Sequence, residues 1–176
     1  MAYNLVIDQT ITEIGYPSEP VTLEEAKAYA RVEVSNTAQD ILFGLWIQGA
    51  REYIEQSTGL SLVPKSIVAT LSNPQGGIEV PFGPVTSAIT WTDINGNIPT
   101  VVTRGASFPL IPVPFDIYIG TYSVGYTNAT IPRDLKIAML NMIVSWYENR
   151  GDEATMNAPA SVVVICQKYS RIGLIA

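Results

Sequence analysis

The stretch from residue 130 to residue 151, TIPRDLKIAMLNMIVSWYENRG, constrains the fold more than any other part of the chain. Its apolar residues recur at steps of three and four, which predicts an amphipathic helix over 132–150. Pro132 suits the first helical turn, and Gly151 suits the left-handed conformation that ends a helix. Such a long apolar stripe needs a second apolar helix to cover it. The residues of the stripe are Leu135, Ala138, Met139, Met142, Ile143 and Trp146.

A second helix, over about 38–58 and ending at Gly59, is the predicted partner. Gly44 and Gly49 each cost about 1 kcal/mol in a helix interior, so we expect another helix to approach closely there. Packing the two helices together would build the core. The predicted buried face is Leu42, Leu45, Trp46, Gly49, Tyr53 and Ile54, whereas Gln39, Asp40, Arg51, Glu52 and Glu55 are predicted to lie mostly away from it.

The N-terminal segment contains one strand-like and one helical signal. Residues 1–16 mix β-branched and polar residues and predict a strand or an extended arm. The sequence VTLEEAKAYARV then predicts a short helix, with Thr22 as N-cap and Glu25 completing a capping box. Its predicted buried side is Leu23, Ala26, Ala30 and Tyr29.

The region 64–126 has a different pattern, in which short β-rich runs alternate with proline and glycine. Asn95-Gly96 predicts a two-residue hairpin turn, and Gly120 and Gly125 predict a bulge or a bend. We therefore expect residues 1–63 and 127–176 to form a helical core with terminal arms, and residues 64–126 to form a β-rich insert.

The last element and the fold class follow from these patterns. SVVVICQKYSRI has strand-like composition, but its apolar residues fall at helical spacing and favour a short helix after Pro159. The expected class is α+β: a small helical bundle of about four helices with an antiparallel β-rich insert between core helices.

Composition restricts the classes of function. Of the 176 residues, 47% are hydrophobic and 15% are charged, so the chain can fill a core, and we expect a soluble protein. The net charge of −6 lies in residues 1–63, which hold nine acids and three bases. No cluster of Lys and Arg is present, which argues against sequence-specific nucleic-acid binding. An acidic surface that lines or repels DNA stays open as an alternative.

The sequence contains few residues that could take part in catalysis or bind a metal ion. The chain has no His and one Cys, which excludes His-based catalytic sets and multi-cysteine metal sites. The acid pairs Glu24-Glu25 and Asp152-Glu153 fit a helix start and a solvated loop, and Cys166 after VVVI fits a packing thiol. We therefore expect no enzyme activity, no cofactor and no metal.

The three tryptophans fall in different settings. Trp46 and Trp146 lie on predicted apolar helix faces, so we expect them in the core. Trp91 lies near the Asn95-Gly96 turn and either packs inside the insert or faces a partner. The candidate assembly residues are therefore Trp91 and Ile94.

The order of these landmarks resembles that of one protein family. EPVTLEEAKAYARVE, then AREYIEQSTGLSL, then YSVGYTNATIPRDLKIAMLNMIVSWYENRG are similar to the head–tail connector (adaptor) proteins of tailed bacteriophages, in a longer form with a β-rich insert. The resemblance covers about residues 19–151.

The resemblance implies a structural role in the virion, at the head–tail interface, after assembly in the host cytoplasm. Such proteins form a ring, commonly of twelve copies, below the portal protein, and a tail-side stopper or tail completion protein follows. DNA passes through the channel of the ring without sequence-specific binding, and no membrane, cofactor or catalysis is involved.

The C-terminal segment of such proteins reaches toward the portal. The resemblance therefore gives four portal-binding candidates, with folding back onto the protein's own helices as the alternative for this tail. These candidates are Arg171, Ile172, Leu174 and Ile175. A different function also stays open: a small non-enzymatic binding module that uses the β-rich insert and Trp91 to hold sugar or peptide.

Overall fold

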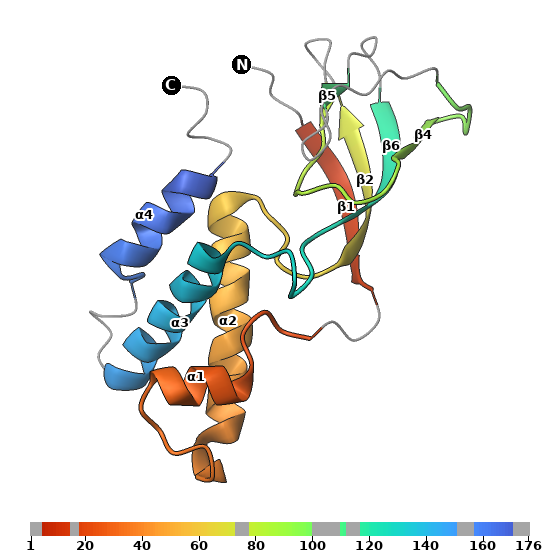
Figure 1. Cartoon of the computed structure of the whole chain (residues 1–176). Coiled ribbons are helices and arrows are strands. Elements are labelled where there is room, and N and C mark those ends of the chain that lie inside the picture. Colours follow the sequence, from red (N-terminus) through yellow and green to blue (C-terminus); the bar gives the residue numbers. More distant parts are fainter. Residues whose placement is uncertain are drawn as a thin grey trace. The chain divides into compact units, whose positions relative to one another are not determined.

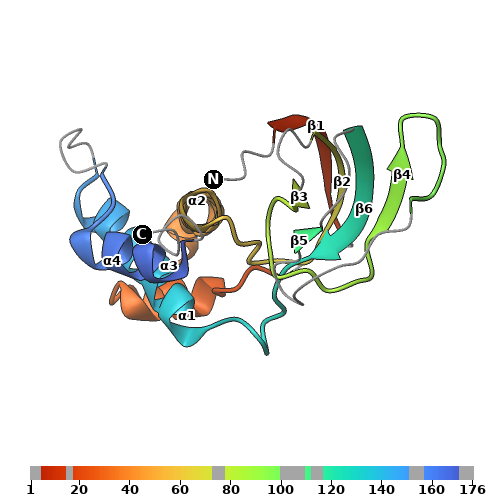
Figure 2. The same cartoon turned by 90° about the horizontal axis from the view of Figure 1, so that it is seen from above.

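The computed structural model describes residues 5–14, 18–72, 78–99, 110–111, 117–150 and 157–170. The chain divides into two compact units, which we name the β unit (residues 1–17 and 63–126) and the helical unit (residues 18–62 and 127–176). Figures 1 and 2 show the helices and strands of each unit. The α+β class is confirmed, with an antiparallel sheet whose strands are mostly inserted between two core helices.

The helical unit is built around the pair of helices that the sequence predicted. Helix α3 packs along α2, and α1 and α4 each contact both of them (Figure 1). The prediction that these two long helices form the core pair is therefore confirmed. The elements are α1 (Leu23–Tyr29), the 3-10 helix η1 (Thr37–Gln39), α2 (Asp40–Thr58), α3 (Arg133–Glu148) and α4 (Ala160–Tyr169).

The α3 face is buried as predicted, apart from its last residue. Trp146 is half-buried and lies against Gly49, where an added Cβ would lie 3.4 Å from the indole Cζ3. This contact confirms a close approach at Gly49, whereas a Cβ at Gly44 would meet nothing within 4 Å. The expectation for Gly44 is therefore wrong within this chain. The fully buried residues of α3 are Leu135, Ala138, Met139, Met142 and Ile143.

The buried face of α2 differs from the prediction by one residue along the helix. Leu42 and Leu45 are 43% and 59% exposed, and Trp46 is half-buried. Nearly every residue from 41 to 47 is apolar, so helical spacing alone cannot choose between two faces. Packing against α3 selects the other one, on which Phe43, Ile47 and Ala50 are buried, whereas Ile54 is buried as predicted.

The helix ends follow local chemistry. The backbone N–H of Glu25 donates to Thr22 Oγ1 at 3.1 Å, and the N–H of Thr22 donates to Glu25 Oε2 at 2.9 Å, so the predicted capping box is confirmed. Gly59 ends α2 with a φ of 70°, also as predicted. The predicted helix after Pro159 is confirmed as α4. Gly151 lies outside the described residues.

The β unit holds a four-stranded antiparallel sheet in the order β1-β2-β6-β4. Strand β1 from the N-terminal segment pairs with β2, so this segment joins the sheet. The prediction had instead grouped it with the helical core. A separate antiparallel pair joins β3 and β5. The strands are β1 (Leu5–Glu13), β2 (Lys65–Ser72), β3 (Ile78–Glu79), β4 (Thr90–Asp93), β5 (Leu110–Ile111) and β6 (Ile117–Val124).

One face of this sheet is buried. Alternate residues of β2 and β6 point into a core that also contains Trp91 from β4. Gly120 pairs regularly with Ala69, so it forms no bulge; its missing side chain makes room for the indole of Trp91. Gly125 bends the chain after β6 with a φ of 114°, where a Cβ would collide with Val63 O.

Candidate functional site

The metal-ligating residue types in the described part of the chain do not gather at one place. No group of three or more His, Cys, Asp or Glu side chains lies within metal-binding reach in this part of the chain. Nor does any helix among the described residues have the length and hydropathy that crossing a membrane requires. The candidate sites are therefore polar networks and surfaces.

The acid pairs and the cysteine have structural surroundings. The hydrogen bond from the Thr22 N–H holds the pKa of Glu25 below its usual value, and Lys136 Nζ lies 3.2 Å from its Oε1. Burial raises the pKa of the Cys166 thiol, which favours the less nucleophilic protonated form. Asp152 and Glu153 lie outside the described residues.

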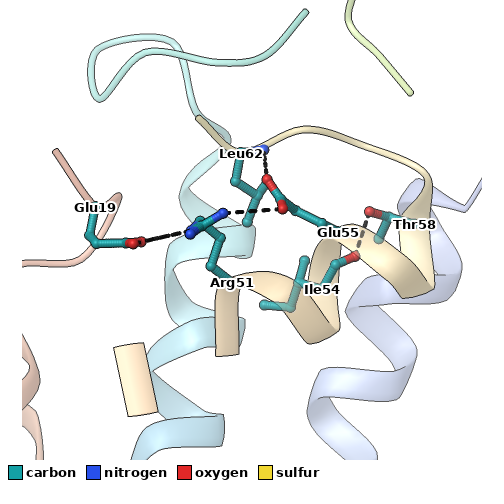
Figure 3. A network of polar contacts seen from close by, with 6 residues as sticks. All are labelled: Glu19, Arg51, Ile54, Glu55, Thr58 and Leu62. Carbon is teal, nitrogen blue, oxygen red and sulfur yellow. Dashed lines mark hydrogen bonds and ion pairs between the residues drawn. The ribbon is translucent and has the colours of Figure 1, made fainter. Parts of the chain in front are cut away.

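A buried ionic network lies along α2 (Figure 3). Arg51 Nε donates to Glu19 Oε1 and Oε2 at 3.2 and 3.0 Å, and its Nη1 donates to Glu55 Oε2 at 3.4 Å. Glu55 Oε1 accepts a hydrogen bond from the Leu62 N–H at 2.7 Å. The network thus ties the segment before α1 and the turn after α2 to the middle of α2. Two carboxylates on one guanidinium form a structural clamp, which leaves neither as a free catalytic base.

Sequence reasoning placed Arg51 and Glu55 on the solvent side, and this was wrong. Their side chains are each 7% exposed, because Glu19 and the Leu62 N–H satisfy their charges and hydrogen bonds. The spacing of Arg51 and Glu55, four residues apart on a helix, is the signal that could have found the pair.

Lys27 is a second buried charge that the sequence did not reveal. It is 1% exposed, and its ammonium donates to the carbonyls of Val34 and Asn36 at 3.1 and 2.8 Å and pairs with Asp40. These contacts hold the connection between α1 and α2 in place. In α1, Ala26 is buried as predicted, but Tyr29 is 47% exposed.

A turn is present at Asn95-Gly96, but among the described residues no strand follows it to complete the predicted hairpin, and β4 pairs with β6 instead. The Gly96 N–H donates to Asp93 O at 3.0 Å, and the Asp93 N–H donates to Asn97 O at 2.9 Å. The three residues between Asp93 and Asn97 therefore form the loop, with Gly96 at a φ of 82°. Hydrogen bonds from Asn97 and Asn95 lower the pKa of the Asp93 carboxyl and fix the turn.

The two assembly candidates differ in accessibility. Ile94, at the tip of this loop, is 62% exposed, so it is available to a partner. Trp91 is 5% exposed and packs on Gly120, so the expectation that its ring faces a partner is corrected. The reason is the missing side chain at Gly120, which lets the indole lie inside the sheet's core.

Three exposed apolar residues of the helical unit lie close together on α2. Ile41, Leu42 and Leu45 are 83%, 43% and 59% exposed. Beside them runs a groove of about 530 Å³. Its walls are Ser18, Glu19, Val21, Thr22 and Leu23 on one side and Ile41, Gly44, Leu45, Ile47 and Gln48 on the other.

The portal-binding candidates lie beyond the last described residue. Helix α4 ends at Tyr169 and Ser170 is extended, whereas Arg171, Ile172, Leu174 and Ile175 lie outside the described residues. Their assignment stays a prediction.

Comparison with solved structures identifies the fold. A chain in the neck of an empty gene transfer agent (GTA) particle, computed with sixfold symmetry, superposes with a TM-score of 0.70 and 18% sequence identity, over 92% of this chain and 95% of that one. This is the fold of a small neck protein of a phage-like particle. A chain in the virion of a native GTA particle gives a TM-score of 0.69 at 18% identity, over 91% and 94% of the two chains.

A third match supports the same assignment. A chain in the neck of a native GTA particle, computed with twelvefold symmetry, gives a TM-score of 0.60 at 18% identity, over 92% and 94% of the chains. Neither a family model nor a curated protein sequence matches the chain. The resemblance to head–tail connector proteins is thus confirmed at the level of the fold.

Proposed function

We propose that this chain is a structural component of a virion neck, and specifically the head–tail connector (adaptor) that forms a ring below the portal. The observation that carries the proposal is the match over 92% of this chain to a neck chain that is itself covered to 95%. Because both units take part in so complete a match, the β unit belongs to the shared architecture and is not an unrelated appendage. The symmetric particles of the matched chains support a ring of several copies, with twelve as the proposed number.

The chemistry of the chain is compatible with a structural role next to DNA. Residues 1–63 carry a net charge of −6, and acidic surfaces discourage DNA from binding while it passes. The proposed ring extends the DNA channel without reading sequence, and joins the portal to a tail-side stopper or tail completion protein. The proposed location is the virion, reached after assembly in the host cytoplasm.

The alternative function loses its main support. A module that holds sugar or peptide on an aromatic platform needs an accessible ring. Trp91, the aromatic residue on which that alternative relied, is 5% exposed.

A deletion experiment tests the function. Particles are produced from the genome that encodes this chain, with the gene intact, deleted, or deleted and supplied in trans. We expect the deletion to leave filled heads and tails unjoined, and the supplied gene to restore joined particles. Tailed, infectious particles without the chain would contradict the proposal.

The C-terminal segment is the proposed portal contact. Burying Ile172 and Leu174 on the portal contributes roughly 3–6 kcal/mol per copy before ordering costs, and a ring multiplies this contact. Exchanging both residues for serine is expected to abolish portal binding with unchanged thermal stability, while Gly173→Ser serves as the matched control. Retained portal binding, or lost stability, in the double variant would reject the contact.

A further inference from the structure

Helix α2 carries a second apolar face that the described part of the helical unit leaves open. Ile41, Leu42 and Leu45 lie on the side of α2 away from its buried residues, and Ile41 is the most exposed at 83%. Gly44 leaves open space beside them. We name Ile41, Leu42 and Leu45 the α2 patch. A helix that is apolar on two sides is typically buried on both, so we expect a partner to cover this patch.

The surface next to the α2 patch is concave. The groove of about 530 Å³ runs between the residues that lead into α1 and the first half of α2. Ile41 and Leu45 form one wall, and Val21 and Leu23 form part of the other. Such a concave surface accommodates a protruding apolar side chain of another molecule better than a flat surface does.

A second, separate patch lies on α4. Val163 and Val164 are 37% and 65% exposed, whereas Val162 and Cys166 of the same helix are buried. Figures 1 and 2 show that α1, which borders the groove, and α4 lie on different sides of α3. The helical unit thus presents the α2 patch and this α4 patch (Val163 and Val164) in different directions.

The two parts of the helical unit carry opposite charge. Residues 18–62 hold seven acids and three bases, a net charge of −4, whereas residues 127–176 hold four acids and five bases, a net charge of +1. Exposed Glu52 lies two turns beyond Leu45 on α2, and Lys168 lies one turn beyond Val164 on α4. Glu52 thus places a negative group beside the α2 patch, and Lys168, which pairs with Asp134 of α3, places a positive group beside the α4 patch.

We propose that the α2 patch of one copy binds the α4 patch of the next copy. This inference rests on the proposed ring, and it names the surfaces that build it. Because the contact joins two different surfaces, it is heterologous: every copy keeps one free patch of each kind until rotation closes the ring. Apolar burial supplies the affinity, and the opposite charges set the orientation and make association weaker at high salt.

Two substitutions in the otherwise unaltered chain test the assignment. Leu45→Asp disables the α2 patch and Val164→Asp disables the α4 patch, and both residues are exposed enough for the fold to tolerate the change. Analytical ultracentrifugation is expected to show self-association of the unaltered chain and at least about tenfold weaker association of each variant, because a carboxylate must be desolvated. An equimolar mixture of the two variants should form a heterodimer and nothing larger, since each supplies the patch that the other lacks.

The control is Ile137→Asp. Ile137 is 47% exposed on α3 and belongs to neither patch, so this variant should associate like the unaltered chain. Circular dichroism of each variant establishes that it is folded. Three results would overturn the proposal: a monomeric mixture, a Val164→Asp variant that associates normally, or an unaltered chain that stays monomeric up to about 1 mM.

The same variants separate this inference from the proposed function. If the chain occupies the neck of its particle and Leu45→Asp assembles there normally, the surface assignment fails and the function stands. If the chain is missing from the neck altogether, the proposed function fails.

Discussion

Replacing Arg51 by methionine removes the cation that two carboxylates share in the network along α2 (Figure 3). The side chains of Arg51 and Glu55 are each 7% exposed and that of Glu19 is 26% exposed. Removing one partner of a buried ion pair typically costs about 3–5 kcal/mol, because a charge is left uncompensated. Glu55 keeps its 2.7 Å bond from the Leu62 N–H, and Glu19 can turn to water, so we expect the lower end, about 3 kcal/mol.

The assay is urea unfolding followed by far-ultraviolet circular dichroism, which reports mainly on the helical unit. Glu52→Gln is the matched control, because Glu52 is the exposed next residue of the same helix, and its cost should stay within about 0.5 kcal/mol. Adding Glu55→Leu to Arg51→Met should recover part of the loss, since the second change removes the unpaired charge. An Arg51→Met variant within about 0.5 kcal/mol of the unaltered chain would refute the reasoning.

Three further predictions address other parts of the chain. Gly120→Ala should destabilise the β unit by about 1–3 kcal/mol, because the new Cβ would lie 2.8 Å from Trp91 Cζ3; unchanged unfolding would contradict this. The pKa of Asp93, measured by NMR titration, should lie below 3.8, because hydrogen bonds from Asn97 stabilise its carboxylate. This stabilisation is present above pH 3.8 and is lost as the pH falls through the lowered pKa. A pKa at or above 3.8 would disprove the prediction. Trp146→Ala should cost about 1–3 kcal/mol in thermal unfolding, less than the 3–5 kcal/mol typical of a fully buried tryptophan, since its ring is half-buried; a loss above about 4 kcal/mol would show that this partial burial is misjudged.

Local signals in the sequence predicted the elements well. The capping box at Thr22, the glycine after α2 and the stripe of α3 each depend on contacts within a few residues, so they can be recognised without the fold. The pairing of β1 with β2 depends on residues more than fifty positions apart, and no local pattern showed that the N-terminal segment joins the sheet.

The errors on α2 have a common physical origin. Where Ile41, Leu42, Phe43 and Leu45 crowd one stretch, hydrophobic spacing fits two faces, and tertiary packing decides between them. Charged residues such as Arg51 are buried only when distant partners satisfy them, and sequence spacing does not reveal a partner 32 residues away. The same ambiguity on α2 is informative, because the face that the fold leaves open is the one proposed to meet a second copy.

The most direct test of the account is electron cryomicroscopy of the particle whose genome encodes this chain, at a resolution that separates helices. The account predicts a ring of copies in the neck, with the first half of α2 in each copy lying against α4 of its neighbour. A neck with no density for this chain would contradict the proposed function, and a ring whose copies meet through other surfaces would contradict the interface.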